Sequence, residues 1–334
     1  MKSILLIGGA GYIGPVIAQE LLNQEHKVTV LDLLIYKTDI GITALVNNPK
    51  FKFILGDFCI AKVLDDALIG ITDVIILGGL VGDPITKKYP IESSAINDVG
   101  IINCISLLKK KNLNRVIFIS TCSNYGLIAN DELASEDFPL SPLSLYSKSK
   151  VKAEQFILTK DSETNYIPTV IRFATAFGLA PRMRFDLTVN EFVAELYFNK
   201  KLDIFDADTW RPYCHVNDFA KLINLVLDAP ENLVSFEVFN AGSDSNNYTK
   251  RRLVELIREF IPHCDLRFLS HGSDPRNYKV SFNKVQSALG FQSTYSIEKG
   301  IEDLIYSLEQ GSFENYLDNK NSFGNYEIEY TRYV

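Results

Sequence analysis

The stretch ILLIGGAGYIG, residues 4–14, places three glycines directly after an apolar strand and at the start of an amphipathic segment. Glycines in such a strand-to-helix turn let a ligand approach the backbone closely, and the amides at a helix N-terminus face a diphosphate. The pattern predicts a dinucleotide-binding turn, with a ligand-free glycine-rich turn as the alternative. The cofactor contacts expected from this turn are Gly8, Gly11, Tyr12, Ile13 and Gly14.

Acidic residues follow the next two strand candidates. Asp32 ends the run KVTVLD, where a carboxylate accepts hydrogen bonds from both ribose hydroxyls and repels a 2′-phosphate; no arginine follows nearby, so NAD is favoured over NADP. Asp57 in LGDF is expected to meet the adenine amino group, with an ordinary helix N-cap as the alternative. Further cofactor contacts are expected at Phe58, Leu77, Gly78 and Gly79.

Short apolar runs alternate with amphipathic segments through the first half of the chain. The expected strands cover residues 2–8, 27–33, 51–57, 72–79, 115–121 and 166–173. Amphipathic segments such as 11–24, 87–110 and 143–160 lie between them. Near-continuous apolar strands separated by helices predict an α/β fold with a doubly wound parallel sheet.

After about residue 173 the elements become shorter. Helices are expected near 185–200, 215–228, 249–261 and 297–310, with a brief strand near 202–205. We therefore expect a Rossmann cofactor-binding domain over 1–172. Residues 173–334 are expected to form mainly a smaller α/β substrate-binding lobe, with some chain returning to the first domain. The tail from Ser312, rich in Tyr and Phe, is interpreted as a strap over its own chain, with an arm to a partner subunit as the alternative.

Composition narrows the classes of partner. The net charge of -7 and the pI near 5.3 argue against nucleic acid and anionic membranes. The five cysteines are widely spaced without a CxxC motif and the four histidines are scattered, which predicts a reducing cytoplasm and no metal site. The N-terminus has no signal-peptide pattern, and no segment is expected to reach the ~18 to 20 apolar residues of a membrane span.

Tyr146 and Lys150 lie four residues apart in the helical stretch SLYSKSKVKAEQ, which brings them to one face. Thr121 ends the fifth expected strand. Together with the GxxGxxG turn, these residues resemble the extended short-chain dehydrogenase/reductases of the nucleotide-sugar epimerase/dehydratase branch, over nearly the full chain. The resemblance implies NAD as cofactor, a nucleotide-sugar substrate, and a homodimer that pairs helices 87–110 and 143–160.

The resemblance gives each of the three residues a role. Tyr146 would take a proton from a sugar hydroxyl, Thr121 would hydrogen-bond the reacting oxygen, and Lys150 would assist Tyr146 and hold the nicotinamide ribose. A tyrosine pKa near 10 must fall by ~3 units, about 4 kcal/mol, to serve near pH 7. An ammonium some 4 to 5 Å away supplies roughly 3 to 4 kcal/mol at an effective dielectric constant near 20. We therefore expect Lys150 to activate Tyr146.

The segment FISTCSNYG, residues 118–126, has no carboxylate after its threonine. The 4,6-dehydratases that the chain resembles carry a glutamate there, whereas this chain has Cys122 and Ser123. A serine hydroxyl, or a thiol with a pKa near ~8.5, is a poor replacement for an acid and base pair. The sequence therefore argues against dehydration and favours oxidation at one carbinol, with or without return of the hydride. Cys122 is expected to be a buried filler.

Three arginine-bearing segments in the second half stand out in an acidic chain: PRMRFDLTVNEF, TWRPYCHVNDF and DPRNYKVS. The resemblance implies that such residues hold the nucleotide ribose and diphosphate, where a guanidinium suits phosphate oxygens. A surface ion pair is the alternative for each arginine. His215 and Asp218 are expected to be structural. The expected substrate contacts are Arg182, Arg184, Asn190, Arg211 and Arg276.

The RMRFDLTVNEF block, with RFATAFG before it, resembles bacterial nucleotide-sugar enzymes that build surface polysaccharides, some of which oxidise GDP-heptoses at C4. The leading expectation is an NAD-dependent nucleotide-sugar 4-dehydrogenase. A 4-epimerase is the close alternative, and a non-catalytic NAD-binding module is a remote one.

Overall fold

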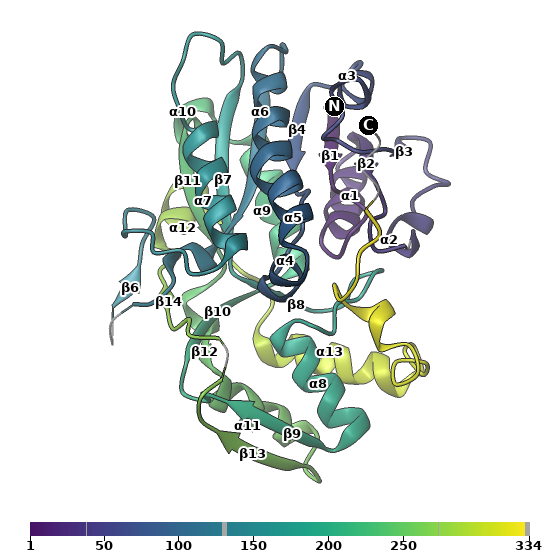
Figure 1. Cartoon of the computed structure of the whole chain (residues 1–334), viewed down its shortest axis with the longest axis vertical. Helices are drawn as coiled ribbons and strands as arrows, with labels where there is room; N and C mark the ends of the chain where they lie inside the picture. The colour runs from purple at the N-terminus through teal and green to yellow at the C-terminus, as the bar shows by residue number, and fades with distance from the viewer. Residues whose placement is uncertain (38, 129–131, 273, 331–334) are drawn as a thin grey trace.

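The computed structural model describes residues 1–37, 39–128, 132–272 and 274–330. Its larger lobe is built on one parallel sheet of seven strands, in the order β11-β7-β5-β4-β1-β2-β3 (Figure 1). The chain winds from β1 towards β3, then returns to β4 and winds the other way, so the expected doubly wound fold is confirmed. The strands are β1 (Ser3–Ile7), β2 (Lys27–Asp32), β3 (Phe51–Leu55), β4 (Asp73–Ile76), β5 (Arg115–Thr121), β7 (Ile167–Phe173) and β11 (Glu237–Ala241).

Helices cover both faces of this sheet, because alternate residues of each strand point to opposite sides. Ile4 and Leu6 of β1 pack in the core with α1 (Gly14–Asn23) and α9 (Val216–Asp228). Leu5 and Ile7 pack on the other face with α3 (Ala61–Ala67), α6 (Ile101–Lys109) and α7 (Leu145–Ile157). Every residue of β5 is buried, as expected for a central parallel strand.

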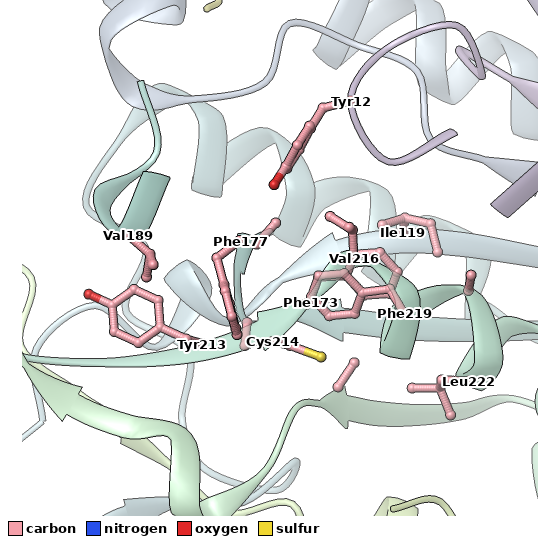
Figure 2. Close-up of a cluster of buried hydrophobic side chains, with 14 of the residues drawn as sticks. Tyr12, Ile119, Phe173, Phe177, Val189, Tyr213, Cys214, Val216, Phe219 and Leu222 are labelled. Carbon is pink, nitrogen blue, oxygen red and sulfur yellow. The ribbon is translucent and has the colours of Figure 1, made fainter. Parts of the chain in front are cut away.

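The second half of the chain contributes to both lobes. Its strand β11 pairs with β7, and its helix α9 packs beside α1. Figure 2 shows Phe173 of β7 stacked on Phe219 of α9, with ring centroids 3.7 Å apart. These contacts fix the second half firmly against the cofactor-binding sheet.

The smaller lobe holds a three-stranded sheet β12-β10-β8, a two-stranded sheet β13-β9 and three of the expected helices. Its elements are β8 (Thr175–Phe177), α8 (Thr188–Asn199), β9 (Lys201–Phe205), β10 (Trp210–His215), β12 (Asn247–Thr249), α11 (Lys250–Phe260), β13 (Asp265–Leu269) and α13 (Ile297–Glu309). Shorter helices and strands include α2 (Ile40–Thr43), α4 (Asp83–Lys88), β6 (Leu133–Ala134), α10 (Glu231–Val234), β14 (Lys279–Val280) and α12 (Asn283–Leu289), and 3-10 helices cover Cys122–Tyr125, Asp244–Asn246 and Lys320–Phe323.

The expectation that no segment reaches the length and apolarity of a membrane span is wrong for one helix. Pro90–Lys109 is a continuous helix of 20 residues with mean hydropathy 1.2, made of α5 (Pro90–Ser93), a π-helical turn (Ser94–Gly100) and α6. About half of it, 44%, is buried in the protein. Its apolar side, including Ile101 and Ile105, packs on the sheet, which accounts for its composition.

The aromatic tail packs on its own chain, as expected. Phe185 is surrounded by three tail rings, those of Phe313, Tyr316 and Phe323, with ring centroids 5.1–5.9 Å away. Beyond them the tail continues to the larger lobe, where the backbone N–H of Glu329 donates to the carbonyl of Ile35 (Figure 1). Residues 331–334, the end of the expected strap, lie outside the described residues.

Glu191 of α8 gives a stability prediction. Burial, together with the neighbouring Glu195, raises its pKa to about 7 against the opposing effect of Lys320. A carboxyl group with a raised pKa in the folded state costs stability as pH rises from its unfolded value through the folded one. Glu191→Gln is therefore expected to raise the free energy of unfolding by about 2 kcal/mol at pH 8.

The same substitution should change little at pH 4, where the carboxyl is protonated in both states. Urea denaturation at the two pH values measures the difference, with the exposed Glu259→Gln as control. An equal effect at both pH values would contradict the assignment of the cost to this carboxylate.

Candidate active site

A cleft of about 430 Å³ opens at the carboxyl ends of the parallel strands, where doubly wound sheets bind ligands at the reversal of strand order. Its walls come from both lobes: the β1–α1 turn, the ends of β2 to β5 and β7, and the segment 182–188 with Arg211 and Arg276. The described residues hold no group of three or more His, Cys, Asp or Glu placed to bind a metal ion.

The three glycines of the β1–α1 turn have different tasks. Gly8 has φ 75°, and a Cβ there would collide with the backbone of Gly78 after β4. A Cβ on Gly14 would strike the carbonyl of Gly9. Gly11 lines the cleft and has nothing within 4 Å of its would-be Cβ. Helix α1 has no capping side chain and no acidic residue in its first turn, so the open floor at Gly11 fits a diphosphate.

Gly11→Ala should separate ligand binding from folding. The added methyl group meets no protein atom but enters the cleft above the helix N-terminus. We expect NAD affinity to fall at least about tenfold, about 1.4 kcal/mol, with little change in the melting temperature of the cofactor-free protein. Fluorescence titration and thermal unfolding test this. Gly14→Ala, which meets backbone, should instead lower stability. Unchanged NAD affinity in Gly11→Ala would place the diphosphate elsewhere.

Asp32, at the end of β2, is tied to the glycine turn. Its Oδ2 accepts from the backbone N–H of Ala10 at 2.9 Å, and its Oδ1 accepts from that of Leu34 at 2.8 Å. Burial raises the pKa of this carboxyl. Each oxygen has a second lone pair, so Asp32 retains the capacity to accept the two ribose hydroxyls.

Asp57, after β3, lies in the cleft wall beside Phe58. Its Oδ1 accepts from the backbone N–H of Cys59 at 2.8 Å, which closes a turn ahead of α3. The N-cap of that helix is Ile60, so the N-cap alternative for Asp57 does not hold. Its Oδ2 accepts from the hydroxyl of Tyr330 in the tail, at 3.1 Å.

Thr121, Tyr146 and Lys150 all line the cleft. Helix α7 begins with a capping box between Ser144 and Ser147, which fixes the first turn and thereby Tyr146. The Nζ of Lys150 lies 5.9 Å from the centre of the Tyr146 ring. The three residues therefore occupy one region of the cleft.

The charges around Tyr146 differ from those expected. Burial raises the pKa of its phenol, Asp83 raises it further, and Arg184 and Arg276 lower it. Lys150 instead donates to the carbonyl of Ile119 at 2.7 Å, and burial lowers its own pKa to about 8. Arg184 and Arg276 are therefore further protein cations that favour ionisation of the phenol, in addition to the expected effect of Lys150.

The two residues that follow Thr121, Cys122 and Ser123, provide no carboxylic acid in the cleft. The Thr121 Oγ1 accepts from the backbone N–H of Ser123 at 3.1 Å. Cys122 is buried, its thiol donates to the carbonyl of Arg172, and burial raises the pKa of that thiol, as suits a filler. The hydroxyl of Ser123 lines the cleft and accepts from Arg276 at 3.1 Å.

Arg211 and Arg276 share one carboxylate in the cleft wall. Asp274 accepts from Arg211 at 2.9 Å and from Arg276 at 2.7 Å. Burial raises the pKa of Asp274, but the two guanidinium groups more than offset this and hold it well below its usual range. Arg276 also pairs with Asp83 at 3.1 Å. These ion pairs fix the orientation of both guanidinium groups.

Arg184 and Arg182 line the cleft from the segment between β8 and α8. Arg184 forms a two-point pair with Asp186, at 3.0 and 2.5 Å. Arg182 lies over the ring of Tyr36, with its Cζ 4.6 Å from the ring centre, and donates to the tail. The Nε of Arg182 is buried without a hydrogen-bond partner, which suits a ligand in the cleft.

Asn190 is not brought to the cleft. It is fully buried, and its amide bonds to the N–H of Gly178, the hydroxyl of Tyr12 and the carbonyl of Arg184. These bonds use both donors of the Asn190 amide and one lone pair of its oxygen. Asn190 therefore supports the wall of the cleft and does not line it.

His215 and Asp218 have structural partners. His215 caps α9 by accepting from the backbone N–H of Asn217, and its ring stacks on Tyr295 at 4.0 Å. Asp218 is fully buried and accepts from the backbone of Thr294 and Tyr295.

Several residues of the cleft were not singled out by the sequence. They are Tyr36, Asp83, Asp186, Asp274, Asn325 and Tyr330. The sequence does contain a sign of Asp83, because it lies in a Gly-Asp-Pro tripeptide that follows β4, at the edge of the sheet where ligands bind. No local pattern indicates Asn325 and Tyr330 of the tail, since their partners are distant in sequence.

Known proteins resemble this chain over most of its length. The low-salt glycan biosynthesis protein Agl12 of Haloferax volcanii is 28% identical over 309 residues, 90% of this chain and 96% of that protein. A UDP-glucose 4-epimerase of Lactobacillus helveticus is 26% identical over 326 residues, 90% and 94% of the two chains. The UDP-glucuronic acid 4-epimerase of Bacillus cereus, solved with UDP-glucuronic acid and NAD, is 25% identical with a TM-score of 0.82, covering 92% of this chain and 99% of that one.

Residues 4–242 match the NAD dependent epimerase/dehydratase family. The match includes the glycine turn, Asp32 and the helix that carries Tyr146 and Lys150. The chain therefore belongs to the NAD dependent epimerase/dehydratase family, and its cofactor is NAD.

Proposed function

We propose that the protein is a nucleotide-sugar 4-dehydrogenase, which oxidises the C4 carbinol of a nucleotide-diphosphate hexose or heptose to a ketone. The observation that carries this proposal is Ser123, a hydroxyl bonded to Arg276, at the position where a dehydratase has an acid. The cleft thus offers the phenol of Tyr146 for proton transfer, and no acid follows Thr121 in the sequence to eliminate water.

In the proposed reaction NAD, when bound, supplies the hydride acceptor and a positive ring. Tyr146 removes the proton of the C4 hydroxyl as the carbon loses its hydride, and the Thr121 hydroxyl hydrogen-bonds the reacting oxygen. Arg184 and Arg276 favour the ionised phenol. We propose that Lys150, held against β5 by its bond to Ile119, binds the nicotinamide ribose.

For the substrate, we propose that the arginines around the cleft receive the diphosphate, because a guanidinium matches phosphate oxygens at two points. Arg182, Arg184, Arg211 and Arg276 all line the cleft, and each except Arg182 is held by a carboxylate. Asp83 has one buried oxygen without a partner, and we propose that it accepts a sugar hydroxyl near Tyr146. GDP-linked sugars for surface polysaccharide are the proposed class.

The alternative is a 4-epimerase, in which the keto sugar rotates and the hydride returns to the other face. Two of the three similar proteins described above are 4-epimerases, and the same residues would perform both half-reactions. A non-catalytic NAD-binding module is a remote alternative, since it has no need of Thr121, Tyr146 and Lys150 together.

Incubation with candidate nucleotide sugars in deuterated water distinguishes these functions. A 4-dehydrogenase produces NADH absorbance at 340 nm or a 4-keto product. A 4-epimerase produces the C4-inverted sugar without net change in the cofactor. Binding of NAD with no product from any nucleotide sugar would favour the module.

We further propose a cytoplasmic homodimer. Ile91 of α5, Val99 of the π-helical turn and Leu145 of α7 are exposed, on the helical segments that pair between subunits in the family that the sequence resembles. Light scattering tests the stoichiometry, and a monomeric mass would remove this proposal.

A further inference from the structure

The segment Gly324–Tyr330 crosses from the smaller lobe to the ends of β2 and β3. In Figure 1 it is the yellow chain that rises beside α2. Arg182 donates to the carbonyl of Gly324 at 3.2 Å, and the Asn325 side chain donates to the carbonyl of Val81 at 3.3 Å. The far end is tied by the bond from Glu329 to Ile35, at 3.0 Å. The segment is therefore anchored to both walls of the cleft.

Two side chains of this segment belong to the cleft itself. Asn325 and Tyr330 line it, together with Asp32 and Asp57. The hydroxyl of Tyr330 donates to Asp57 Oδ2 at 3.1 Å. The ring of Tyr330 packs in a small apolar cluster around Leu80, Ile85 and Ile96, whose other members are Ile35, Phe58, Cys59, Tyr89 and Ile328.

This position corresponds to the adenosine end expected for the cofactor. Asp32 is the expected ribose carboxylate, and Asp57 with Phe58 forms the expected adenine edge. A tyrosine offers a flat apolar face with one polar tip, which suits a purine ring and its amino group. We propose that Gly324–Tyr330 is the outer wall of the adenosine pocket, in which Tyr330 contacts the adenine and slows release of the cofactor. This rests on the NAD cofactor and not on the choice of sugar reaction.

The bond between Tyr330 and Asp57 does not exclude the adenine amino group. A carboxylate oxygen accepts two hydrogen bonds, and Asp57 Oδ2 is used once by Tyr330. Tyr330 and the adenine can therefore share this carboxylate. The opposite possibility, that the tail competes with the adenine, predicts faster or tighter cofactor binding when Tyr330 is removed.

Beyond the buried anchor at Gly324 and Asn325, the outer part of the segment, residues 326–330, is anchored weakly enough to lift. Its ion pairs, Lys37 with Glu329 at 2.8 Å and Lys88 with Glu327 at 3.6 Å, join side chains that are at least half exposed. Such surface pairs contribute little, and the described segment adds few backbone hydrogen bonds. The segment can open for exchange without disturbing the sheet beneath it.

The test measures release of NADH from full-length variants by stopped-flow fluorescence, with excess NAD as competitor. We expect Tyr330→Ala to release NADH about 10- to 100-fold faster and Tyr330→Phe to lie between it and the parent. Glu329→Lys changes no cleft residue but sets two lysines against each other, and should also speed release. Tyr306→Ala, an equally large change on an exposed residue, is the control.

Circular dichroism and the melting temperature of each cofactor-free variant establish that it is folded. The Glu329→Lys variant decides the matter if Tyr330→Ala unfolds. Unchanged or slower release in both variants would overturn the proposal. Because NADH release involves no sugar, this outcome is independent of the nucleotide-sugar reaction.

Discussion

Tyr146→Phe is expected to lower kcat for the sugar substrate by about 10³- to 10⁴-fold while NAD still binds. The phenol is the group that the proposed reaction asks to accept a proton. Phenylalanine keeps the ring in the cleft but removes the only atom that can take that proton. The capping box between Ser144 and Ser147, which fixes the first turn of α7, does not involve the phenol, so folding should be unaffected.

The measurement is turnover of the identified nucleotide sugar together with the dissociation constant of NADH. Tyr306→Phe removes a hydroxyl from an exposed tyrosine and serves as the matched control, with unchanged turnover. Turnover of Tyr146→Phe within tenfold of the parent would remove the assignment of this residue as base. Loss of NAD binding would instead show that the substitution had disturbed the cofactor site.

The strands and the cofactor turn could be predicted because their signals are local. The strands of a covered parallel sheet are apolar on both faces, so each appears as a short apolar run in sequence. The roles of Gly8 and Gly14 follow from the turn that joins β1 to α1, and Asp32 follows from the end of the next strand.

What the sequence could not supply are contacts between distant segments. Tyr330 and Asp57 are separated by 273 positions, and nothing near either residue indicates the pairing. Tyr146 and Lys150 were correctly placed in one region of the cleft, but the bond of Lys150 to Ile119 depends on how α7 packs on β5. Asn190 lies in a motif that resembles the substrate-binding motif of the family. Its amide is nevertheless hydrogen-bonded to Gly178 and Tyr12 of the protein and is not available to a substrate.

The largest expected loss of stability comes from Glu154, beneath the proposed catalytic residues. Its carboxylate accepts from Arg172 at 2.8 Å and from Asn124 at 2.7 Å, and also from the hydroxyl of Ser120. Glu154 and Arg172 are both buried, with side-chain exposures of 2% and 6%. Glu154→Ala is expected to lower the free energy of unfolding by about 3 to 5 kcal/mol, because Arg172 is left buried without a counter-charge.

Urea denaturation measures this loss, and a second variant tests its cause. If the uncompensated charge is responsible, Glu154→Leu combined with Arg172→Met should be more stable than Glu154→Ala, since a buried pair can be replaced by apolar side chains. Recovery should be partial, because Ser120 and Asn124 lose their acceptor. Asp66→Ala removes the exposed pair with Lys62 and should cost less than about 1 kcal/mol. Ser120 and Asn124 flank Thr121 and Ser123, so a folded double variant should still lose turnover. A loss below about 1 kcal/mol in Glu154→Ala would mean that Arg172 finds another partner.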